Sequence, residues 1–363
     1  MSDLIPGAGT PDRRFAELRL AEFAPRRSLR RTLSPLSRLS VRAVDMHNHL
    51  GRWLTGDGSW MTPDVGELNE LMDRIGLATI VNLDGRWGNE LDDNVTRYDA
   101  SYPGRYRTFC HLDWSRLKGD HATEALIGDL HRARDQGAQG LKVWKDLGLS
   151  ITDGHSQRVL PDDRRLTEVF SAAGELGLPV LIHTADPRAF WAPLDRHNER
   201  LDELQEMPSW WFGGPEHPSY DRLMAALANV VRRSPGTTFI GAHVGGAADD
   251  LDWVARLMDE CLNFHVDTAG RLNELGRTPR RFGRLVAQHP DRILFGSDCF
   301  PPDEDQLLAY ARFLETDDEC FDYAPGCEIP PQGRWDVSGT ALTGDLLTAV
   351  YAGNAQRILG STR

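Results

Sequence analysis

The 363-residue sequence contains few lysines, no paired cysteines and no long apolar run. Lysine occurs only at Lys118, Lys142 and Lys145, so arginine carries almost all of the positive charge. The net charge is −13, and because an acidic surface repels phosphate backbones we expect no nucleic-acid partner. No stretch approaches ~18 consecutive apolar residues, so we expect no membrane-spanning segment.

The five cysteines form no CxxC pair, and an odd, scattered set is typical of reduced thiols in a cytoplasmic protein. The basic stretch PRRSLRRTL, residues 25–33, is not followed by the apolar segment that an export signal needs. We therefore interpret residues 1–41 as an N-terminal basic arm that lies on the surface. We predict a cytoplasmic protein.

From residue 42 onward, short apolar runs alternate with amphipathic stretches. The runs are rich in β-branched or aromatic residues, and several are introduced by Gly or Pro, as buried parallel strands are. They cover residues 42–50, 78–85, 106–113, 138–146, 178–186, 237–245, 263–270 and 292–298. Eight such units predict an α/β fold, a (β/α)8 TIM barrel, over residues 42–363. A doubly wound open sheet would be favoured by a glycine-rich dinucleotide loop, which the sequence lacks.

Start and stop signals mark several helices between the runs. Residues 62–76 begin with a Thr cap at Thr62 and a proline at Pro63, and residues 163–177 begin with Asp and end at Gly. Residues 249–261 have an acidic first turn, and residues 346–360 form a closing amphipathic helix.

Two segments interrupt this alternation, residues 187–220 after strand five and residues 301–340 after strand eight. Both are long, rich in aromatic residues and interspersed with Pro and Gly. Because they follow the carboxyl ends of strands, which form the active face of a barrel, we interpret them as long loop insertions that act as lids or substrate walls. Packing against a second subunit is the alternative, and it favours a homodimer.

Ionisable side chains occur where several of these runs end. His47 and His49 lie two positions apart, so on a strand they share a face. His183, His243 and Asp298 end the fifth, sixth and eighth runs. The carboxyl ends of all strands in a closed barrel surround one axis. Any one of these histidines alone could be a core residue, but four with a carboxylate favour a divalent transition metal.

Five stretches carry a resemblance to a known family: DMHNHLG, VLIHTADP, FIGAHVGG, ILFGSD and YAGNAQRILG. In order and spacing, residues 42–360 resemble the amidohydrolase superfamily. More narrowly they resemble its amidohydrolase-related branch, which includes decarboxylases of the aminocarboxymuconate-semialdehyde and γ-resorcylate type. The resemblance implies a barrel that binds a divalent metal, often zinc, as one ion or two. It also implies that His47, His49, His183 and Asp298 are the metal ligands, and that His243 contacts the substrate or the activated water.

These residues suggest a reaction. A Lewis-acid metal lowers the pKa of a bound water to about 7, Asp298 can move its proton, and His243 can polarise the group that is cleaved. We expect a hydrolase that attacks an amide, ester or lactone of a small organic substrate. The alternative is a non-oxidative decarboxylase (carboxy-lyase) or hydratase of a small aromatic or unsaturated carboxylate. A barrel without catalytic activity, retained for binding or assembly, is a third possibility. It predicts that some of the metal-ligand residues have been lost, and none has.

Two of the three lysines lie in the fourth run, GLKVWKD. Alternation places Lys142 on one face of the strand and Lys145 on the other. In some members of the superfamily a lysine of this strand is carboxylated and bridges two metals, and Lys142 has the favoured position for that role. A salt bridge to a barrel carboxylate is the alternative for Lys142, and Lys145, nearer the strand end, suits substrate binding.

The rim of the barrel offers further candidates for substrate binding. An arginine there could hold a substrate carboxylate with two hydrogen bonds, although it could equally pair with a neighbouring Asp or Glu and shape a loop. The candidates are Asp186, Glu199, Arg200, Asp267 and Arg271.

Overall fold

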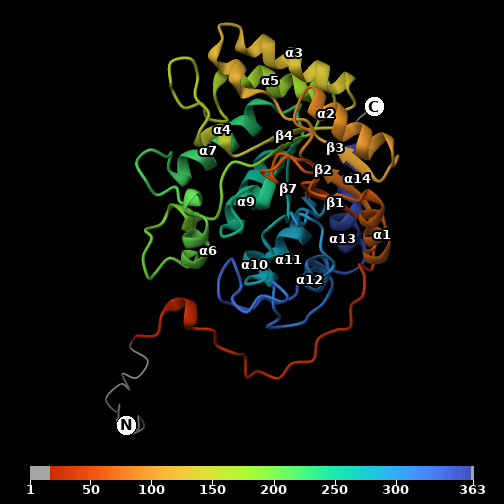
Figure 1. The fold of residues 1–363 in the computed structure, drawn as a ribbon, viewed down its shortest axis with the longest axis vertical. Coiled ribbons are helices and arrows are strands. Elements are labelled where there is room, and N and C mark those ends of the chain that lie inside the picture. The colour runs from red at the N-terminus through yellow and green to blue at the C-terminus, as the bar shows by residue number, and fades with distance from the viewer. Residues whose placement is uncertain (1–16, 361–363) are drawn as a thin grey trace.

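Eight short parallel strands lie at the centre of the computed structural model, which describes residues 17–360 (Figure 1). They are β1 (Ala43–Asn48), β2 (Leu77–Asn82), β3 (Tyr106–Thr108), β4 (Leu141–Val143), β5 (Val180–Ile182), β6 (Phe239–Gly241), β7 (Phe264–Asp267) and β8 (Ile293–Leu294). Each of the eight expected runs contains one strand. Two sheets in the order β1-β2-β3 and β4-β5-β6-β7-β8 make up the barrel.

Backbone hydrogen bonds join the two sheets at both seams. At one seam Cys110 forms a parallel bridge with Leu141. At the other, the backbone N–H of Met46 donates to the carbonyl of Phe295 at 2.9 Å. The barrel is therefore closed, and the expected (β/α)8 fold is confirmed. Side chains from several strands are buried together in one cluster, as expected for a barrel whose interior is filled. They include Val44, Val81, Leu181, Ile240 and Leu294.

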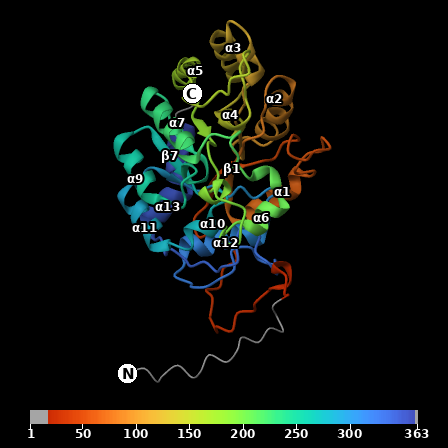
Figure 2. The same cartoon turned by 90° about the vertical axis from the view of Figure 1, so that its left-hand side faces the viewer.

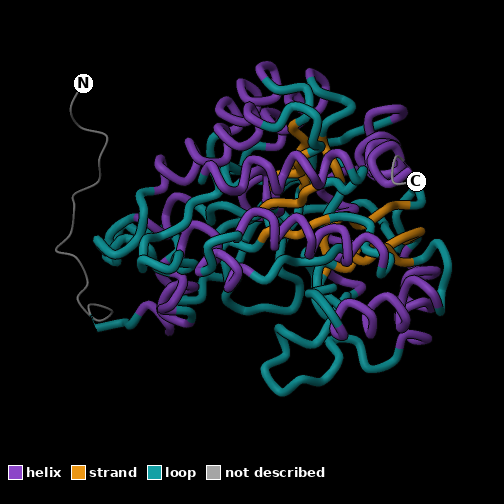
Figure 3. Tube along the Cα trace, turned by 90° about the horizontal axis from the view of Figure 1, so that it is seen from above, coloured by secondary structure: helices purple, strands orange, loops and turns teal. Residues whose placement is uncertain are grey.

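Helices surround the strands on the outside (Figures 1 and 3). They are α1 (Val65–Ile75), α2 (Asn89–Asn94), α3 (Ala122–Asp135), α4 (Asp146–Leu149), α5 (Arg164–Glu175), α6 (Leu201–Glu206), α7 (Tyr220–Arg233), α8 (Ala242–Gly245), α9 (Leu251–Glu260), α10 (Leu272–Leu275), α11 (Pro279–Gln288), α12 (Glu304–Glu315), α13 (Gly344–Thr348) and α14 (Asn354–Gly360). None of the helices in residues 17–360 is long and apolar enough to cross a membrane.

The start of α1 differs from the expectation. Asp64, not Thr62, is the cap, because its carboxylate accepts the backbone N–H groups of Gly66 and Glu67. Pro63 consequently lies before the cap instead of at the first helical position. The expected start of α5 is confirmed, since Asp163 accepts the N–H of Arg165.

Both long segments contain helical structure. After β5, short helical turns at residues 188–191 and 208–210 flank α6. After β8, the amphipathic helix α12 occupies part of the expected loop at residues 301–340, with Asp303 as its cap. The irregular stretch of that region is therefore residues 316–343, called the wall segment below.

The described part of the N-terminal arm, residues 17–41, passes below the barrel next to the wall segment (Figures 1 and 2). Arg27 is paired there with Asp322 and Asp336. Leu39 is buried and its N–H donates to the carbonyl of Ile75. Residues 1–16 of the expected arm lie outside the described residues, and the boundary at residue 41 stays a prediction.

Candidate metal centre

Two buried carboxylates orient His47 on β1 and His49 just after it. His47 Nδ1 lies 2.8 Å from Asp267 Oδ2, and His49 Nδ1 lies 2.6 Å from Asp84 Oδ1. When these carboxylates are ionised they can only accept, so that Nδ1 carries the hydrogen in both rings and Nε2 keeps its lone pair. A carboxylate that receives the other N–H is the usual support of a metal-binding histidine.

Both free nitrogens face one oxygen of Asp298. Asp298 Oδ1 lies 3.7 Å from His47 Nε2 and 3.6 Å from His49 Nε2. Two atoms that each bind one ion at 2.0–2.2 Å in tetrahedral geometry lie about 3.4 Å apart. Asp298 Oδ1 is buried and has no hydrogen-bond partner. Each of the two nitrogens is therefore at about the distance from Asp298 Oδ1 at which both atoms could bind one ion.

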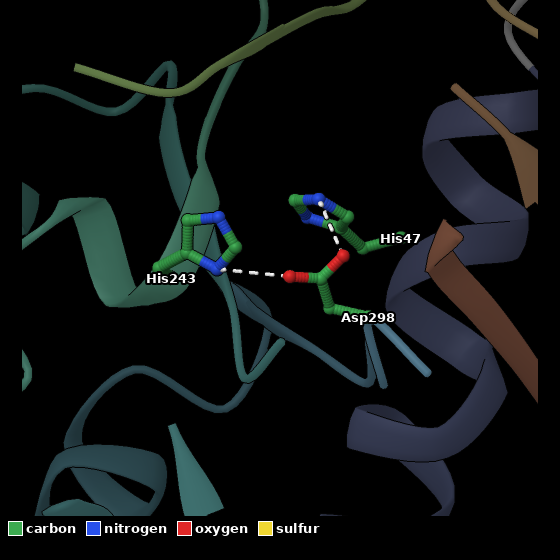
Figure 4. Close-up of side chains that lie close together, drawn as sticks. All are labelled: His47, His243 and Asp298. Carbon is green, nitrogen blue, oxygen red and sulfur yellow. Dashed lines mark ion pairs between the residues drawn. The ribbon is translucent and has the colours of Figure 1, made fainter. Parts of the chain in front are cut away.

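His243 closes the group from the opposite side, and Figure 4 shows Asp298 between His243 and His47. Its backbone N–H donates to Asp267 at 2.7 Å, and its Nδ1 donates to the carbonyl of Ala269 at 2.8 Å. His47, His243 and Asp298 each present a possible ligand atom within 4.8 Å of the other two. His243 and Asp298 both have a positive φ, 58° and 56°, which directs their side chains inward at sharp bends after β6 and β8.

His183 lies beside this group. Its ring centroid is 4.3 Å from that of His243. His183 Nε2 contacts Asp186 Oδ1 at 3.2 Å, whereas its Nδ1 is buried without a hydrogen-bond partner. The structure thus gathers all four expected histidines around Asp298, with His243 in the tightest group and His183 next to it.

Burial keeps His47, His183 and His243 neutral, as metal ligands must be. It lowers the pKa of His183 to about 3, and lowers the pKa of His47 and of His243 well below the ordinary histidine value. Burial also raises the pKa of the Asp298 carboxyl. A cluster of uncharged imidazoles around a desolvated carboxylate is stabilised by a cation.

Lys142 lies on β4, whereas Lys145 lies beyond the end of the strand, immediately before α4, so the expected alternation on opposite strand faces does not extend to it. Lys142 is buried, and its Nζ lies 3.4 Å from His47 Nε2. Burial lowers the pKa of the Lys142 ammonium to about 8. Lys145 Nζ donates to Asp186 Oδ2 at 2.7 Å and lies 5.1 Å from the centroid of the Trp210 ring.

Asp186 connects Lys145 to the metal centre. Besides Lys145 it contacts His183, and Arg271 Nη2 lies 3.6 Å from its Oδ1. Burial by itself would raise the pKa of Asp186, but the charge of Lys145 and the hydrogen bond with His183 hold it well below its ordinary value. Two cations and a histidine therefore share one carboxylate at the rim of the site.

The remaining rim candidates have other contacts. Asp267 is fully buried and holds His47 and His243 in place. Arg200 is buried and pairs with Glu203 at 2.6 Å and with Glu274. Glu199 forms two hydrogen bonds with Arg277, and both side chains are well exposed. The contacts of Arg200 and Glu199 match the structural alternative that the sequence left open.

Sequence reasoning missed Asp84. It lies one residue before the end of the second apolar run, close to the position that Asp298 has in the eighth, so the same strand-end pattern could have identified it. Besides His49, it accepts hydrogen bonds from Trp53 Nε1 at 2.5 Å and from the backbone of Gly51 at 3.1 Å.

A cavity of about 920 Å³ opens next to Asp298. One side is lined by α6 and the following turn, through Glu203 and Trp210, and the outer side by the wall segment, including Tyr323. Phe300 lines it near the metal centre, with its ring centroid 5.1 Å from that of His49. The walls combine aromatic surface with a few charged groups, which is typical of a small-molecule site.

The family model described as Amidohydrolase matches residues 44–361. No curated protein sequence matches the chain. Among solved structures, a 2,6-dihydroxybenzoate decarboxylase in complex with 2,6-dihydroxybenzoate has a TM-score of 0.54 at 17% identity, covering 88% of this chain and 99% of its own.

Two further solved structures are similar. A dihydroxybenzoic acid decarboxylase from a Polaromonas species, with bound manganese and the inhibitor 2-nitroresorcinol, has a TM-score of 0.54 at 15% identity, covering 89% of this chain and 98% of its own. An amidohydrolase from Burkholderia multivorans with bound zinc has a TM-score of 0.54 at 12% identity, covering 88% and 99%. At these identities the similarity shows the fold alone.

Proposed function

The chain belongs to the amidohydrolase family, and we propose that it is a metal-dependent hydrolase that cleaves an amide, ester or lactone of a small organic substrate. The observation that carries the proposal is the buried, unpartnered Asp298 Oδ1 at 3.6–3.7 Å from two oriented imidazole nitrogens. The ion would be held by His47, His49 and Asp298, with Zn²⁺ as the expected metal. His183, the ligand implied by the sequence, and His243, which lies closer, are the candidates for a further nitrogen ligand.

The side chains around the ion have separate tasks in this proposal. A bound divalent ion supplies Lewis acidity and activates a water for attack. Asp298 accepts the proton of that water and returns it to the leaving group. His243 is held by the carbonyl of Ala269 through Nδ1, so its other nitrogen is available to polarise the group under attack.

We assign substrate binding to Lys145 and Arg271, the two cationic side chains that contact Asp186. Lys145 and Arg271 carry two positive charges against one carboxylate, which leaves charge to attract an anionic group of the substrate. Lys145 and Arg271 lie on the same side of the site as His183. A substrate whose anionic group binds there would therefore have its reacting carbon directed toward the metal centre. Asp186 would position the two cations before the substrate binds.

The role of Lys142 differs between a site that holds one ion and a site that holds two. The Lys142 amine beside His47 Nε2 is in place to bridge a second ion after carboxylation. Measured metal content separates the two cases. About one ion per chain would mean that Lys142 only balances the charge of the carboxylates. Two ions per chain that fall to one in Lys142→Met would mean that Lys142 bridges them.

A non-oxidative decarboxylase, or a hydratase, is the second candidate. It is favoured by the similarity to two decarboxylase structures and by the cations on Asp186, which suit a carboxylated substrate. In a decarboxylation Asp298 would deliver its proton to the carbon that CO2 leaves, with no attack by water, whereas in a hydration water would add to one carbon of a double bond and the proton to the other. We also propose a cytoplasmic enzyme that forms a homodimer, acts on a small molecule and binds neither nucleic acid nor membranes. Light scattering of the purified protein tests the dimer.

The deciding experiment is a paired assay on metal-loaded protein. Lactones, esters and amides are tested for hydrolysis, and aryl carboxylates are tested for CO2 release, each with Asp298→Asn as the control. We expect hydrolysis that the control lacks. Release of CO2 without any hydrolysis would replace the first candidate by the second, and failure to bind a divalent metal would overturn both.

A further inference from the structure

The wall segment is held from outside by the N-terminal arm. Arg27 Nε donates to Asp336 Oδ2 at 2.7 Å, and Arg27 Nη2 donates to Asp322 Oδ1 at 2.7 Å. Arg31 adds a contact to Asp322 at 3.2 Å. Further along, the backbone N–H and the hydroxyl of Ser34 both donate to Asp318. The arm therefore meets three carboxylates of the wall segment.

The position of Arg27 follows from the pairing of the wall segment. Phe321 and Val337 form an antiparallel bridge, so Asp322 and Asp336 are the next pair and lie opposite each other. Like charges directly opposite on paired strands repel and destabilise the pairing. The Arg27 guanidinium contacts both carboxylates and so removes this repulsion. Arg27 thus holds the two paired sides of the wall segment together.

The inner side of the same wall lines the catalytic cavity. Tyr323 follows Asp322 and faces the cavity, and its hydroxyl is hydrogen-bonded to the backbone of Gln332 and Gly333. Arg334 binds Asp202 in the first turn of α6 and also donates to the carbonyl of Phe23 in the arm. A shift of the wall would thus change the cavity where it opposes Trp210.

Charge, rather than apolar packing, attaches residues 17–31 of the arm. The large apolar side chains Leu18, Leu20, Phe23 and Leu29 are 44–60% exposed, whereas Leu39, further along the arm, is buried in the core. An attachment by partly exposed ion pairs is weakened by salt, because such pairs are screened. Residues 17–31 can therefore separate from the wall while Leu39 stays in the buried core.

We propose that the N-terminal arm is a strap that fixes the outer wall of the catalytic cavity through Arg27, and that it thereby sets substrate affinity. Arg27 is a positioning residue: it acts on the wall and touches no reacting group. The kinetic part of this proposal rests on the proposed function of the cavity, whereas the effect on the wall does not.

The test compares Arg27→Gln with Arg19→Gln, a matched arm variant whose partner Glu22 lies within the arm itself. Hydrogen exchange of residues 321–337 is measured, together with KM, kcat and metal content. In Arg27→Gln we expect about tenfold faster exchange in the wall, a several-fold higher KM, and kcat and metal content within about twofold. Arg19→Gln should match the unmodified chain throughout.

Two further measurements separate bracing from a general loss of structure. Adding Asp336→Asn to Arg27→Gln removes one of the opposed carboxylates, so it should restore slow exchange and the lower KM. Sodium chloride at roughly 0.5 M should bring the unmodified chain toward Arg27→Gln and leave that variant unchanged.

Equal exchange in the Arg27 and Arg19 variants would overturn the strap. Fast exchange in the wall with an unchanged KM would overturn its role in substrate affinity. If the protein proves to have no metal-dependent activity, the exchange result still decides whether the strap exists, so the failure of the two proposals is distinguishable.

Discussion

His47 donates its Nδ1 hydrogen to Asp267, and the same carboxylate accepts the backbone N–H of His243. One fully buried group on β7 therefore fixes a histidine of β1 and another after β6. Asp84 has a simpler task, since the only histidine that it holds among the described residues is His49.

Replacing Asp267 by Asn should weaken metal binding more than replacing Asp84 by Asn. Loss of such an orienting carboxylate lowers metal affinity by about 10- to 100-fold, and Asp267 holds the ring of His47 and the backbone of His243, whereas Asp84 holds the ring of His49 alone. Competition with a chelator of known affinity measures both constants. Equal affinities for Asp267→Asn and the unmodified chain would remove the reason for assigning His47 as a ligand.

Asp298→Asn should abolish turnover under either candidate reaction. Loss of a positioned acid–base group costs about 10²- to 10⁴-fold in rate, and an amide cannot move the proton. Asparagine tolerates a positive φ, so the bend at 56° is retained and the variant should fold. Initial rates are compared with the melting temperature of the same sample. A stable variant with full activity would refute the role of Asp298.

Removal of the metal should lower both activity and stability. A ligand present at 100- to 1,000-fold its dissociation constant stabilises the folded state by about 2.7–4.1 kcal/mol. Dialysis against a chelator should therefore lower the melting temperature, and addition of Zn²⁺ or Mn²⁺ should restore it together with turnover. Activity that survives a metal content near zero contradicts this prediction.

Lys145→Met should raise KM for an anionic substrate and leave metal content unchanged. A hydrogen bond to a charged group contributes about 1.5–3 kcal/mol, which corresponds to about 10- to 100-fold in KM. Lys118→Met is the control, because Lys118 is exposed on another part of the barrel. A KM that rises equally for an uncharged analogue would show that Lys145 acts on the shape of the site and not on the substrate charge.

Arg200→Met should destabilise the fold strongly, whereas Arg277→Met should not. Removing one partner of a buried ion pair costs about 3–5 kcal/mol, and Arg200 leaves Glu203 and Glu274 without their cation. The Arg277–Glu199 pair is well exposed, so its loss costs at most about 1 kcal/mol. Urea denaturation of both variants measures the difference. Similar values would show that Arg200 is compensated by other groups.

The sequence predicts the strands well because each is a short apolar run with few competing signals. His47, His49, His183, His243 and Asp298 are found at the strand ends because parallel strands share one active edge. The helix α12 was missed because the Pro-rich flanks of residues 301–340 outweighed the amphipathic pattern inside them.

The contacts between these residues could not be predicted from the sequence. Asp267 was expected to bind substrate, yet it holds a histidine 220 positions earlier in the chain. That contact depends on how far β7 is displaced from β1 around the barrel, which no local pattern encodes. That His243 lies closer to Asp298 than His183 does likewise depends on the positive φ of His243 after β6, which a non-glycine residue seldom adopts.

The seam between β1 and β8 determines when the metal centre can form. The backbone N–H of Asp298 donates to the carbonyl of His47 at 2.9 Å, so the first and last strands of the barrel bring neighbouring residues to the candidate metal centre. A chain still emerging from the ribosome contains His47 and His49 long before Asp298 is synthesised. We therefore expect metal binding at the final stage of folding, because a fragment that ends before β8 lacks Asp298.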